Sequence, residues 1–237
     1  MGADDIDRIV NQARQTLDLT GARLGDEYRY GSLTLCVIDA VYSIGVRYES
    51  VQRVVARYCA CTGLNAYRAD GAVFPALSAQ QPLEHLGRLG ETMKAERLAN
   101  EVFCNRQLTS TRNGILKADA VLRFVAVLRQ NGIERFQDLE SVTDDSAIEA
   151  EIRRLPGQRS GICWTYFRML AGRDDLIKPD RMILRWLGIA LGREVRITEA
   201  QPLLHGAVQR LKPEHPGINA RLLDHLVWGQ QRRTGRA

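Results

Sequence analysis

A tight turn and a carboxylate stand close together in the last third of the chain. The turn is Leu155-Pro156-Gly157, between two helical patterns, and the carboxylate is Asp180, which follows Pro179 at the start of the next one. A turn between helices can bind a DNA backbone, and one carboxylate can stabilise positive charge or activate water. This segment therefore has the clearest chemical potential in the chain. Asp180 has a second interpretation, because aspartate after proline is also a good helix N-cap.

Gly157 is the central residue of the predicted turn. Glycine permits a backbone conformation that is costly for other residues, so successive amide N–H groups can point outward together. The next helix begins soon afterwards and adds the positive end of its dipole. Together these groups predict a site that binds phosphate and reads the nucleic-acid backbone, not the base sequence. The alternative is an ordinary turn between two helices.

Helical periodicity extends through most of the chain, and patterns typical of strands are almost absent. Ser32 is a suitable N-cap for the most apolar of the helical segments, which we expect at the centre of a bundle. The predicted fold class is therefore all-α. The predicted helices are Asp4–Leu19, Leu33–Ile44, Val51–Cys61, Leu83–Leu89, Glu91–Cys104, Lys117–Gln130, Ser146–Arg154, Ser160–Ala171, Arg181–Leu191, Ala200–Leu211 and Ala220–Gln231.

Positive charge is concentrated in the last third of the chain. Residues 151–237 carry 16 Lys or Arg against 8 Asp or Glu, whereas residues 1–150 carry 17 against 20. The basic excess begins where the predicted turn begins, which indicates a polyanionic partner. The alternative is a basic, solvated surface with no partner.

The rest of the composition predicts a cytoplasmic protein with no membrane partner. The amino terminus has neither a basic segment nor an apolar run, which argues against a signal peptide. No apolar stretch approaches the ~18 residues that a membrane span needs. The five cysteines lack the spacing of a disulfide framework and indicate reduced thiols.

Three segments together resemble the helix–hairpin–helix DNA glycosylase superfamily, which includes endonuclease III and the 3-methyladenine glycosylases. The first is the turn Leu155-Pro156-Gly157 with Asp180 at the appropriate spacing downstream. Ile38–Ser43 is similar to the first buried helix of that superfamily, and Gly114–Ala118 is similar to the entry to its later core helix. The resemblance covers roughly residues 32–192.

The resemblance implies a two-lobed helical fold that binds double-stranded DNA as a monomer. It predicts a helical-bundle lobe of residues 32–171, which includes the hairpin. Residues 1–31 and 172–237 would form the second lobe and complete the DNA cleft. A damaged or modified base would be flipped out of the duplex, because its glycosidic bond is otherwise inaccessible. Asp180 matches the catalytic aspartate of the superfamily, which would stabilise the oxocarbenium character of the sugar and position water.

Two positions depart from the superfamily pattern. Arg159 replaces the second glycine of the usual hairpin, and Gly161 stands where bifunctional members carry a Schiff-base lysine. Without that amine we expect a monofunctional enzyme, which leaves an abasic site and has no lyase activity. Gly161 would also leave space for a bulky base, such as a modified cytosine of phage DNA, although close helix packing explains a glycine equally well.

The expected cofactor content follows from the cysteines. The iron–sulfur loop of endonuclease III requires four clustered cysteines near the carboxyl end. The last cysteine of this chain is Cys163, so we expect no iron–sulfur cluster and no other cofactor. The resemblance leaves room for a monovalent cation at the hairpin.

Further site residues follow from the resemblance. The bend after the buried helix is where relatives place a wedge for the vacated base stack, and a core turn is the alternative. The predicted wedge or base-pocket residues are Ile44, Val46, Tyr48 and Gly161. The predicted DNA-binding residues are Leu155, Pro156, Gly157, Gln158, Arg159, Ser160, Gly161, Arg47, Arg112, Lys117 and Arg185.

Two other functions are compatible with the sequence. One is a catalytically inactive DNA-binding protein that keeps the hairpin without the chemistry. The other is a helical scaffold that acts without nucleic acid, which the basic last third of the chain disfavours.

Overall fold

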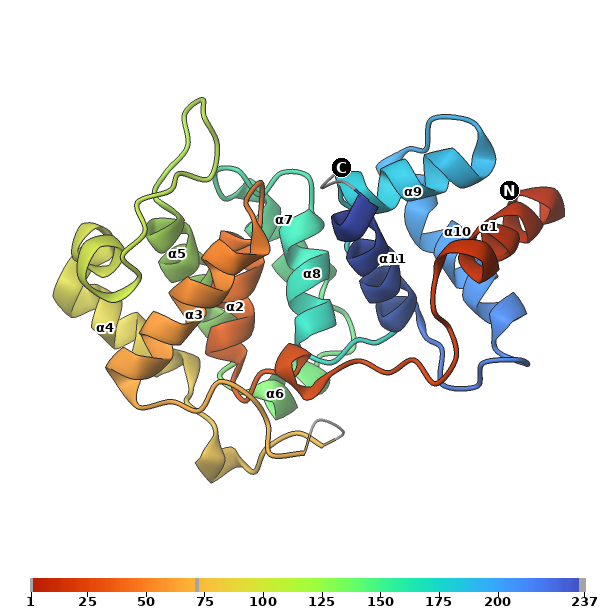
Figure 1. Ribbon diagram of the computed structural model, residues 1–237. Coiled ribbons are helices and arrows are strands. Elements are labelled where there is room, and N and C mark those ends of the chain that lie inside the picture. The colour runs from red at the N-terminus through yellow and green to blue at the C-terminus, as the bar shows by residue number, and fades with distance from the viewer. Residues whose placement is uncertain (1, 71–72, 235–237) are drawn as a thin grey trace. The chain divides into compact units, whose positions relative to one another are not determined.

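The computed structural model describes residues 2–70 and 73–234. Eleven α-helices occupy most of this part of the chain (Figure 1). Its only β pairing consists of two isolated bridges. The fold is therefore all-α, as the helical periodicity predicted. The two short 3-10 turns are η1 (Asp26–Tyr28) and η2 (Leu77–Ala79).

The chain divides into two compact units. The larger unit is Asp26–Ala171, and the smaller unit is Met1–Gly25 together with Gly172–Ala237. Residues 26–31, which the sequence placed in the second lobe, belong to the larger unit. Backbone hydrogen bonds explain this difference. The Gly31 amide donates to the Ala66 carbonyl at 2.9 Å, and the Arg68 amide donates to the Arg29 carbonyl at 3.0 Å.

The centre of the larger unit is α2 (Leu33–Tyr42), whose residues are all buried. Ser32 caps it as predicted, because its hydroxyl accepts a hydrogen bond from the Thr34 amide at 3.2 Å. A helix without a polar face must be surrounded by other helices, because its apolar side chains are stable only away from water. The helices that pack on α2 include α3 (Tyr48–Thr62), α5 (Lys117–Gln130) and α8 (Ile162–Leu170), and α7 (Ser146–Arg154) packs on α5 and α8.

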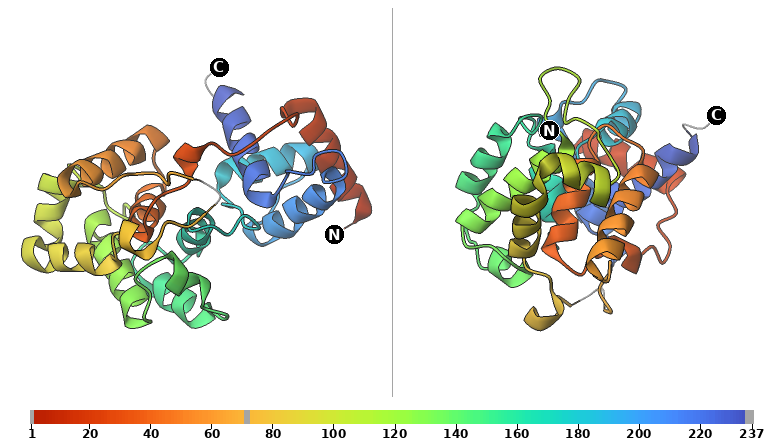
Figure 2. Two further views of the ribbon diagram at one scale, coloured as in Figure 1. Left: turned by 90° about the horizontal axis from the view of Figure 1, so that it is seen from below. Right: turned by 90° about the vertical axis from the view of Figure 1, so that its left-hand side faces the viewer.

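The sequence predicted a break between two helices at Gly90, and this prediction was wrong. The helix α4 runs through Gly90 from Leu83 to Arg97, with a kink at Lys94, and the π turn η3 (Leu98–Val102) follows it. A β-carbon at position 90 would lie 2.3 Å from a methyl carbon of Leu122 on α5. The glycine therefore permits the close approach of α4 and α5, which lie side by side in Figures 1 and 2.

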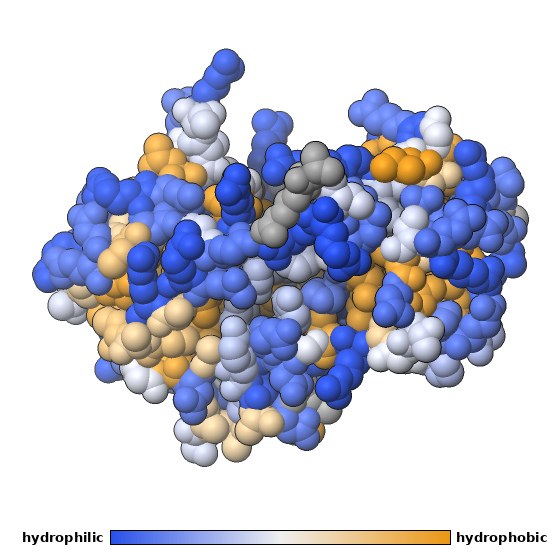
Figure 3. All heavy atoms as spheres, viewed as in Figure 1, coloured by the Kyte–Doolittle hydropathy of each residue, from blue (hydrophilic) through white to orange (hydrophobic). Residues whose placement is uncertain are grey.

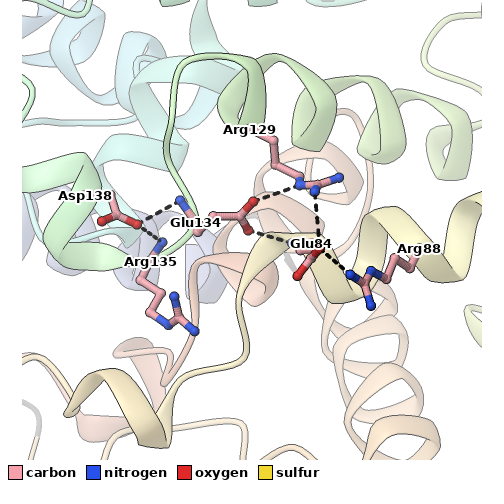
Figure 4. Close-up of polar contacts among 6 residues, drawn as sticks. All are labelled: Glu84, Arg88, Arg129, Glu134, Arg135 and Asp138. Atoms are coloured by element: carbon pink, nitrogen blue, oxygen red, sulfur yellow. Dashed lines mark hydrogen bonds and ion pairs between the residues drawn. The ribbon is translucent and has the colours of Figure 1, made fainter.

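A network of charged groups joins the start of α4 to the end of α5 (Figure 4). The Glu134 carboxylate accepts hydrogen bonds from the Glu84 amide at 2.7 Å and from Arg129 Nε at 2.8 Å. Asp138 in turn accepts a hydrogen bond from the Glu134 amide at 2.9 Å. Asp138 belongs to α6 (Phe136–Glu140), a short helix that the sequence analysis did not predict.

The smaller unit is a bundle of four helices. α1 packs on α9 and α10, and α11 packs on the same two helices; α1 and α10 lie side by side in Figures 1 and 2. Its apolar core includes the fully buried Trp186. The bounds of these helices are α1 (Ala3–Thr16), α9 (Arg181–Leu191), α10 (Ile197–Leu211) and α11 (Ala220–Thr234).

The start of α10 differs from the prediction, which placed it at Ala200. The helix begins at Ile197, because Glu199 closes its first turn by accepting a hydrogen bond from the Arg196 amide at 3.0 Å. Pro202 therefore lies inside the helix.

The surface is mainly polar on the face drawn in Figure 3. Among the described residues, no helix combines the length and the apolar character that a membrane crossing requires.

Candidate functional site

Two consecutive hydrogen-bonded turns connect α7 to α8. The Gln158 amide donates to the Leu155 carbonyl at 3.0 Å, and the Gly161 amide donates to the Gln158 carbonyl at 3.1 Å. α8 consequently begins at Ile162, later than the predicted Ser160. The hairpin between the two helices is present, with a longer turn than the sequence suggested.

Gly157 has a φ of 84°, in the region that favours glycine, so the prediction that this turn needs a glycine is confirmed. Packing adds a second requirement. A β-carbon at position 157 would lie 2.6 Å from the Cβ of Thr109 and 3.0 Å from its carbonyl oxygen. Thr109 is itself held by Ile115, whose carbonyl accepts its amide at 2.9 Å and whose amide donates to its hydroxyl at 3.2 Å. The loop before α5 (yellow-green in Figure 1) thus packs directly against the hairpin.

Three arginines lie around this turn. Arg153, Arg154 and Arg159 line a shallow surface depression together with Leu155-Pro156-Gly157. Arg153 is held by an ion pair with Glu149 at 3.3 Å and by the Arg159 carbonyl, which accepts from its Nε at 3.3 Å. Arg154 and Arg159 are exposed, and no carboxylate in the described part of the chain pairs with them. Their positive charges are therefore available to a ligand.

Backbone donors lie beside these arginines. The amides of Gly157, Arg159 and Ser160 donate to no group in residues 2–70 and 73–234. The amino end of α8 adds its partial positive charge. Unpaired amides, guanidinium groups and a helix terminus together form a site that can bind a phosphate.

Two predicted contacts of the turn are corrected by its geometry. Gln158 is 2% exposed, so its side chain faces the interior and cannot bind DNA. Gly161 has a φ of 78°, and a β-carbon there would lie 3.4 Å from the Glu149 carboxylate and 3.6 Å from the Arg153 guanidinium. The position does not open into free space, because these side chains occupy it. The turn conformation accounts for Gly161, so the glycine is not evidence of room for a bulky base.

Lys117 was predicted to bind DNA, and this prediction was wrong. The residue is 2% exposed. Its ammonium group donates to the carbonyls of Tyr42 at 2.9 Å and Ile44 at 2.8 Å, at the end of α2. The last carbonyls of a helix lack partners within the helix and attract positive charge, which explains the inward position of the lysine.

The bend between α2 and α3 contains the predicted wedge residues. Ile44 and Val46 are half-buried on either side of Gly45, whose φ is 71°. Tyr48 begins α3 and stacks on Tyr28 with 6.4 Å between ring centroids, and burial raises its pKa. Tyr48 is therefore packed within the larger unit. Ile44 and Val46 stay as the predicted wedge.

The remaining predicted DNA contacts are surface arginines. Arg47 and Arg112 are exposed. Arg185 is also exposed, but its Nε donates to the Gln231 side chain at 2.6 Å, which ties α9 to α11.

Asp180 is the N-cap of α9, as one of the two interpretations of the sequence predicted. Its Oδ1 atom accepts hydrogen bonds from the amides of Met182 at 2.8 Å and Ile183 at 3.3 Å. None of the described residues donates to Oδ2, and the side chain is half-buried. One oxygen therefore caps the helix, and the other is available for chemistry.

The smaller unit contains a second carboxyl group, Asp224, which was not predicted from the sequence. It lies on α11 and is 7% exposed, and its Oδ1 accepts a hydrogen bond from the Lys178 amide at 2.9 Å. Burial raises the pKa of Asp224 to about 7, and the charge of Asp180 contributes to this rise. A signal was present, because Asp224 interrupts the apolar stripe that Ala220 and Val227 form on the buried face of α11.

The described residues contain no group of three or more His, Cys, Asp or Glu side chains that could hold a metal ion. The chain belongs to the family described as a domain of unknown function, DUF8548, whose model matches residues 7–232. Comparison with curated proteins and with solved structures gave no match.

Proposed function

We propose that this member of the DUF8548 family is a monofunctional DNA glycosylase of the helix–hairpin–helix superfamily. It flips a damaged or modified base out of double-stranded DNA and hydrolyses the glycosidic bond. The observation that carries the proposal is the α7–α8 turn, where Gly157 at a φ of 84° lies among three arginines, with Asp180 following at the start of α9. The enzyme acts as a cytoplasmic monomer, without an iron–sulfur cluster.

The turn supplies the contacts to the DNA backbone. Its unpaired amides and the exposed Arg154 and Arg159 are suited to the phosphate oxygens. Such contacts release counterions, so binding should weaken steeply as salt increases. They carry no sequence information, and the choice of base depends on groups that contact the flipped nucleotide.

Asp180 supplies the negative charge for the reaction. The sugar gains positive charge as the glycosidic bond breaks, and a carboxylate nearby stabilises that charge. The Oδ2 atom is free of the helix cap and can accept a proton from the attacking water. Gly161 offers no amine, so water attacks the sugar and the product is an abasic site with an intact strand.

A specific observation favours a second candidate, a DNA-binding protein without catalysis. The hydrogen bonds from Met182 and Ile183 to Oδ1 give Asp180 a structural role that needs no chemistry. In this second candidate the hairpin binds DNA and Asp180 only caps α9.

The proposal is tested by base release from duplexes with damaged, mismatched or phage-modified bases, followed by alkali cleavage of abasic sites. We expect release from at least one duplex, and a loss of about 100-fold or more in Asp180→Asn, because asparagine caps nearly as well but carries no charge. Asp144→Asn is the matched control, since Asp144 accepts the Ser146 amide at 3.0 Å at the start of α7. It should retain full activity.

The outcomes separate the candidates. Full activity of Asp180→Asn rejects the catalytic role of this residue. Salt-dependent DNA binding without base release from any duplex selects the non-catalytic candidate. DNA binding that is absent, or insensitive to salt, rejects both.

A further inference from the structure

Residues 174–178, which precede Asp180 in the chain, are held by hydrogen bonds and an ion pair to α11. Arg221, which is 3% exposed, pairs with Asp174 at 3.1 Å, and its amide donates to the Asp174 carbonyl at 3.1 Å. One turn further along α11, Asp224 accepts the Lys178 amide at 2.9 Å. Two successive buried polar groups of one helix therefore fix the same segment at both of its ends.

The second of these contacts leads directly to Asp180. The carbonyl of Lys178 accepts the Asp180 amide at 2.6 Å, so a single residue links the two aspartates. Asp180 then caps α9 through Oδ1. The Arg185–Gln231 hydrogen bond of 2.6 Å is a second tie between α9 and α11.

We propose that Asp224 is a positioning residue for Asp180: it fixes the Lys178 backbone and thereby sets where the free oxygen of Asp180 points. This inference rests on the proposed function, since it assigns a partner to the catalytic carboxylate. Asp224 itself touches neither DNA nor water in this scheme. It acts through one backbone hydrogen bond, which an asparagine would keep and an alanine would lose.

The surroundings of Asp224 determine the pH range in which it can position Asp180. Burial has the largest effect and raises the pKa of Asp224 to about 7. The charge of Asp180 also raises this pKa, whereas the Lys178 amide and the charges of Lys178 and Arg221 oppose the rise. Below that pH, Asp224 is neutral and places no second negative charge beside Asp180. Above it, repulsion between the two carboxylates disturbs the placement of Asp180.

The first test does not require enzymatic activity. In wild type, carbon-13 NMR should detect one aspartate carboxyl group that titrates near pH 7. This titration should be absent from Asp224→Asn and should move to lower pH in Asp180→Asn. Hydrogen exchange of the Lys178 amide should stay slow in Asp224→Asn and become at least about tenfold faster in Asp224→Ala. Unchanged protection in Asp224→Ala, or no carboxyl group titrating above about pH 5, would overturn the proposal.

The second test uses single-turnover base release on a duplex that the wild type cleaves. Asp224→Ala should lose at least about tenfold in rate at unchanged DNA affinity, and Asp224→Asn should restore it. The wild-type rate should fall as the pH rises through about 7, and Asp224→Asn should lack this fall. Equal losses in the two variants, or the same pH profile in both enzymes, would overturn the positioning role. If the wild type releases no base, the proposed function fails, and the first test still decides whether Asp224 holds Asp180.

Discussion

Replacement of Gly157 by alanine tests whether the hairpin is built as the structure indicates. The substitution adds one methyl group to a residue at a φ of 84°, where side chains are strained. The added carbon would also lie 2.6 Å from the Cβ of Thr109 and 3.0 Å from its carbonyl oxygen. Backbone strain and steric overlap are therefore both expected, and each lowers the free energy of unfolding by a separate amount.

A matched control separates the two effects. Gly132 has a φ of 74°, and a β-carbon there would meet nothing within 4 Å, so Gly132→Ala introduces strain alone. Strain in the left-handed region costs about 1–2 kcal/mol, partly offset by the lower entropy of the unfolded alanine chain. Overpacking against Thr109 adds about 1–3 kcal/mol. We expect a loss of about 1 kcal/mol in Gly132→Ala and about 2–4 kcal/mol in Gly157→Ala.

The assay is urea denaturation followed by far-ultraviolet circular dichroism, which suits an all-helical chain. Both variants should keep the wild-type dependence on urea, with lower midpoints. DNA affinity should fall only in Gly157→Ala, because Gly132 lies at the far end of α5 from the loop that contacts the hairpin. An equal loss of stability in both variants would refute the packing of Thr109 against the turn.

The remaining predictions concern charged groups. Burial raises the pKa of Asp224 from an ordinary value of 3.8 to about 7, so the folded state binds more protons than the unfolded state between these values. The unfolding free energy of wild type relative to Asp224→Asn should therefore fall by about 4 kcal/mol between pH 4 and 8 in urea titrations; a constant difference would contradict the raised pKa. Lys117→Met should lower the unfolding free energy by about 2–4 kcal/mol in the same assay, because two carbonyls lose a charged donor. Arg154→Met should leave stability unchanged and reduce the salt dependence of DNA binding by about one phosphate contact. If Lys117→Met instead reduced the salt dependence and left stability unchanged, Lys117 would be a DNA ligand after all. Glu134→Ala should cost about 1–2 kcal/mol by urea denaturation, because the Glu84 amide and Arg129 lose their acceptor. Glu101→Ala is the control and should have no measurable effect, because it removes only the exposed ion pair between Glu101 and Arg97 at 2.9 Å.

Several helices could be predicted to the residue because their signals are local. The apolar stripe of α5 fits the period of 3.6 residues, and Asn131-Gly132 follows its last turn. The bounds of α7 and α9 were also predicted correctly. A carboxylate accepts a hydrogen bond from an amide at the start of each helix, Asp144 from Ser146 in α7 and Asp180 from Met182 in α9. The glycine of the hairpin was identified for the same reason, because an isolated glycine between two helices predicts a residue with positive φ.

Other glycines show why local reasoning fails. Gly90 was interpreted as a helix break, but it makes room for Leu122 on another helix. Gly161 was interpreted as space for a ligand, but it turns the chain into α8 beside Glu149 and Arg153. Glycine can serve close packing, a turn or ligand binding. Which of these roles applies depends on the residues that contact the glycine, and these lie elsewhere in the sequence. Lys117 presents the same difficulty, because its partners lie on a helix far earlier in the chain.

Helix capping explains why position 180 is an aspartate, but it does not explain why position 224 is one. A cap alone accounts for an aspartate at position 180, since Oδ1 holds two amides at the start of α9. It does not account for a carboxyl group at position 224. An asparagine could accept the hydrogen bond from the Lys178 amide equally well. Unlike aspartate, it has no ionised form, so it would not suffer from burial beside another carboxylate. A carboxyl group at this position costs stability and makes no hydrogen bond that an asparagine could not make, so a role toward Asp180 would explain it. The pH dependence of base release, compared between aspartate and asparagine at position 224, therefore tests the proposed positioning of Asp180 by Asp224.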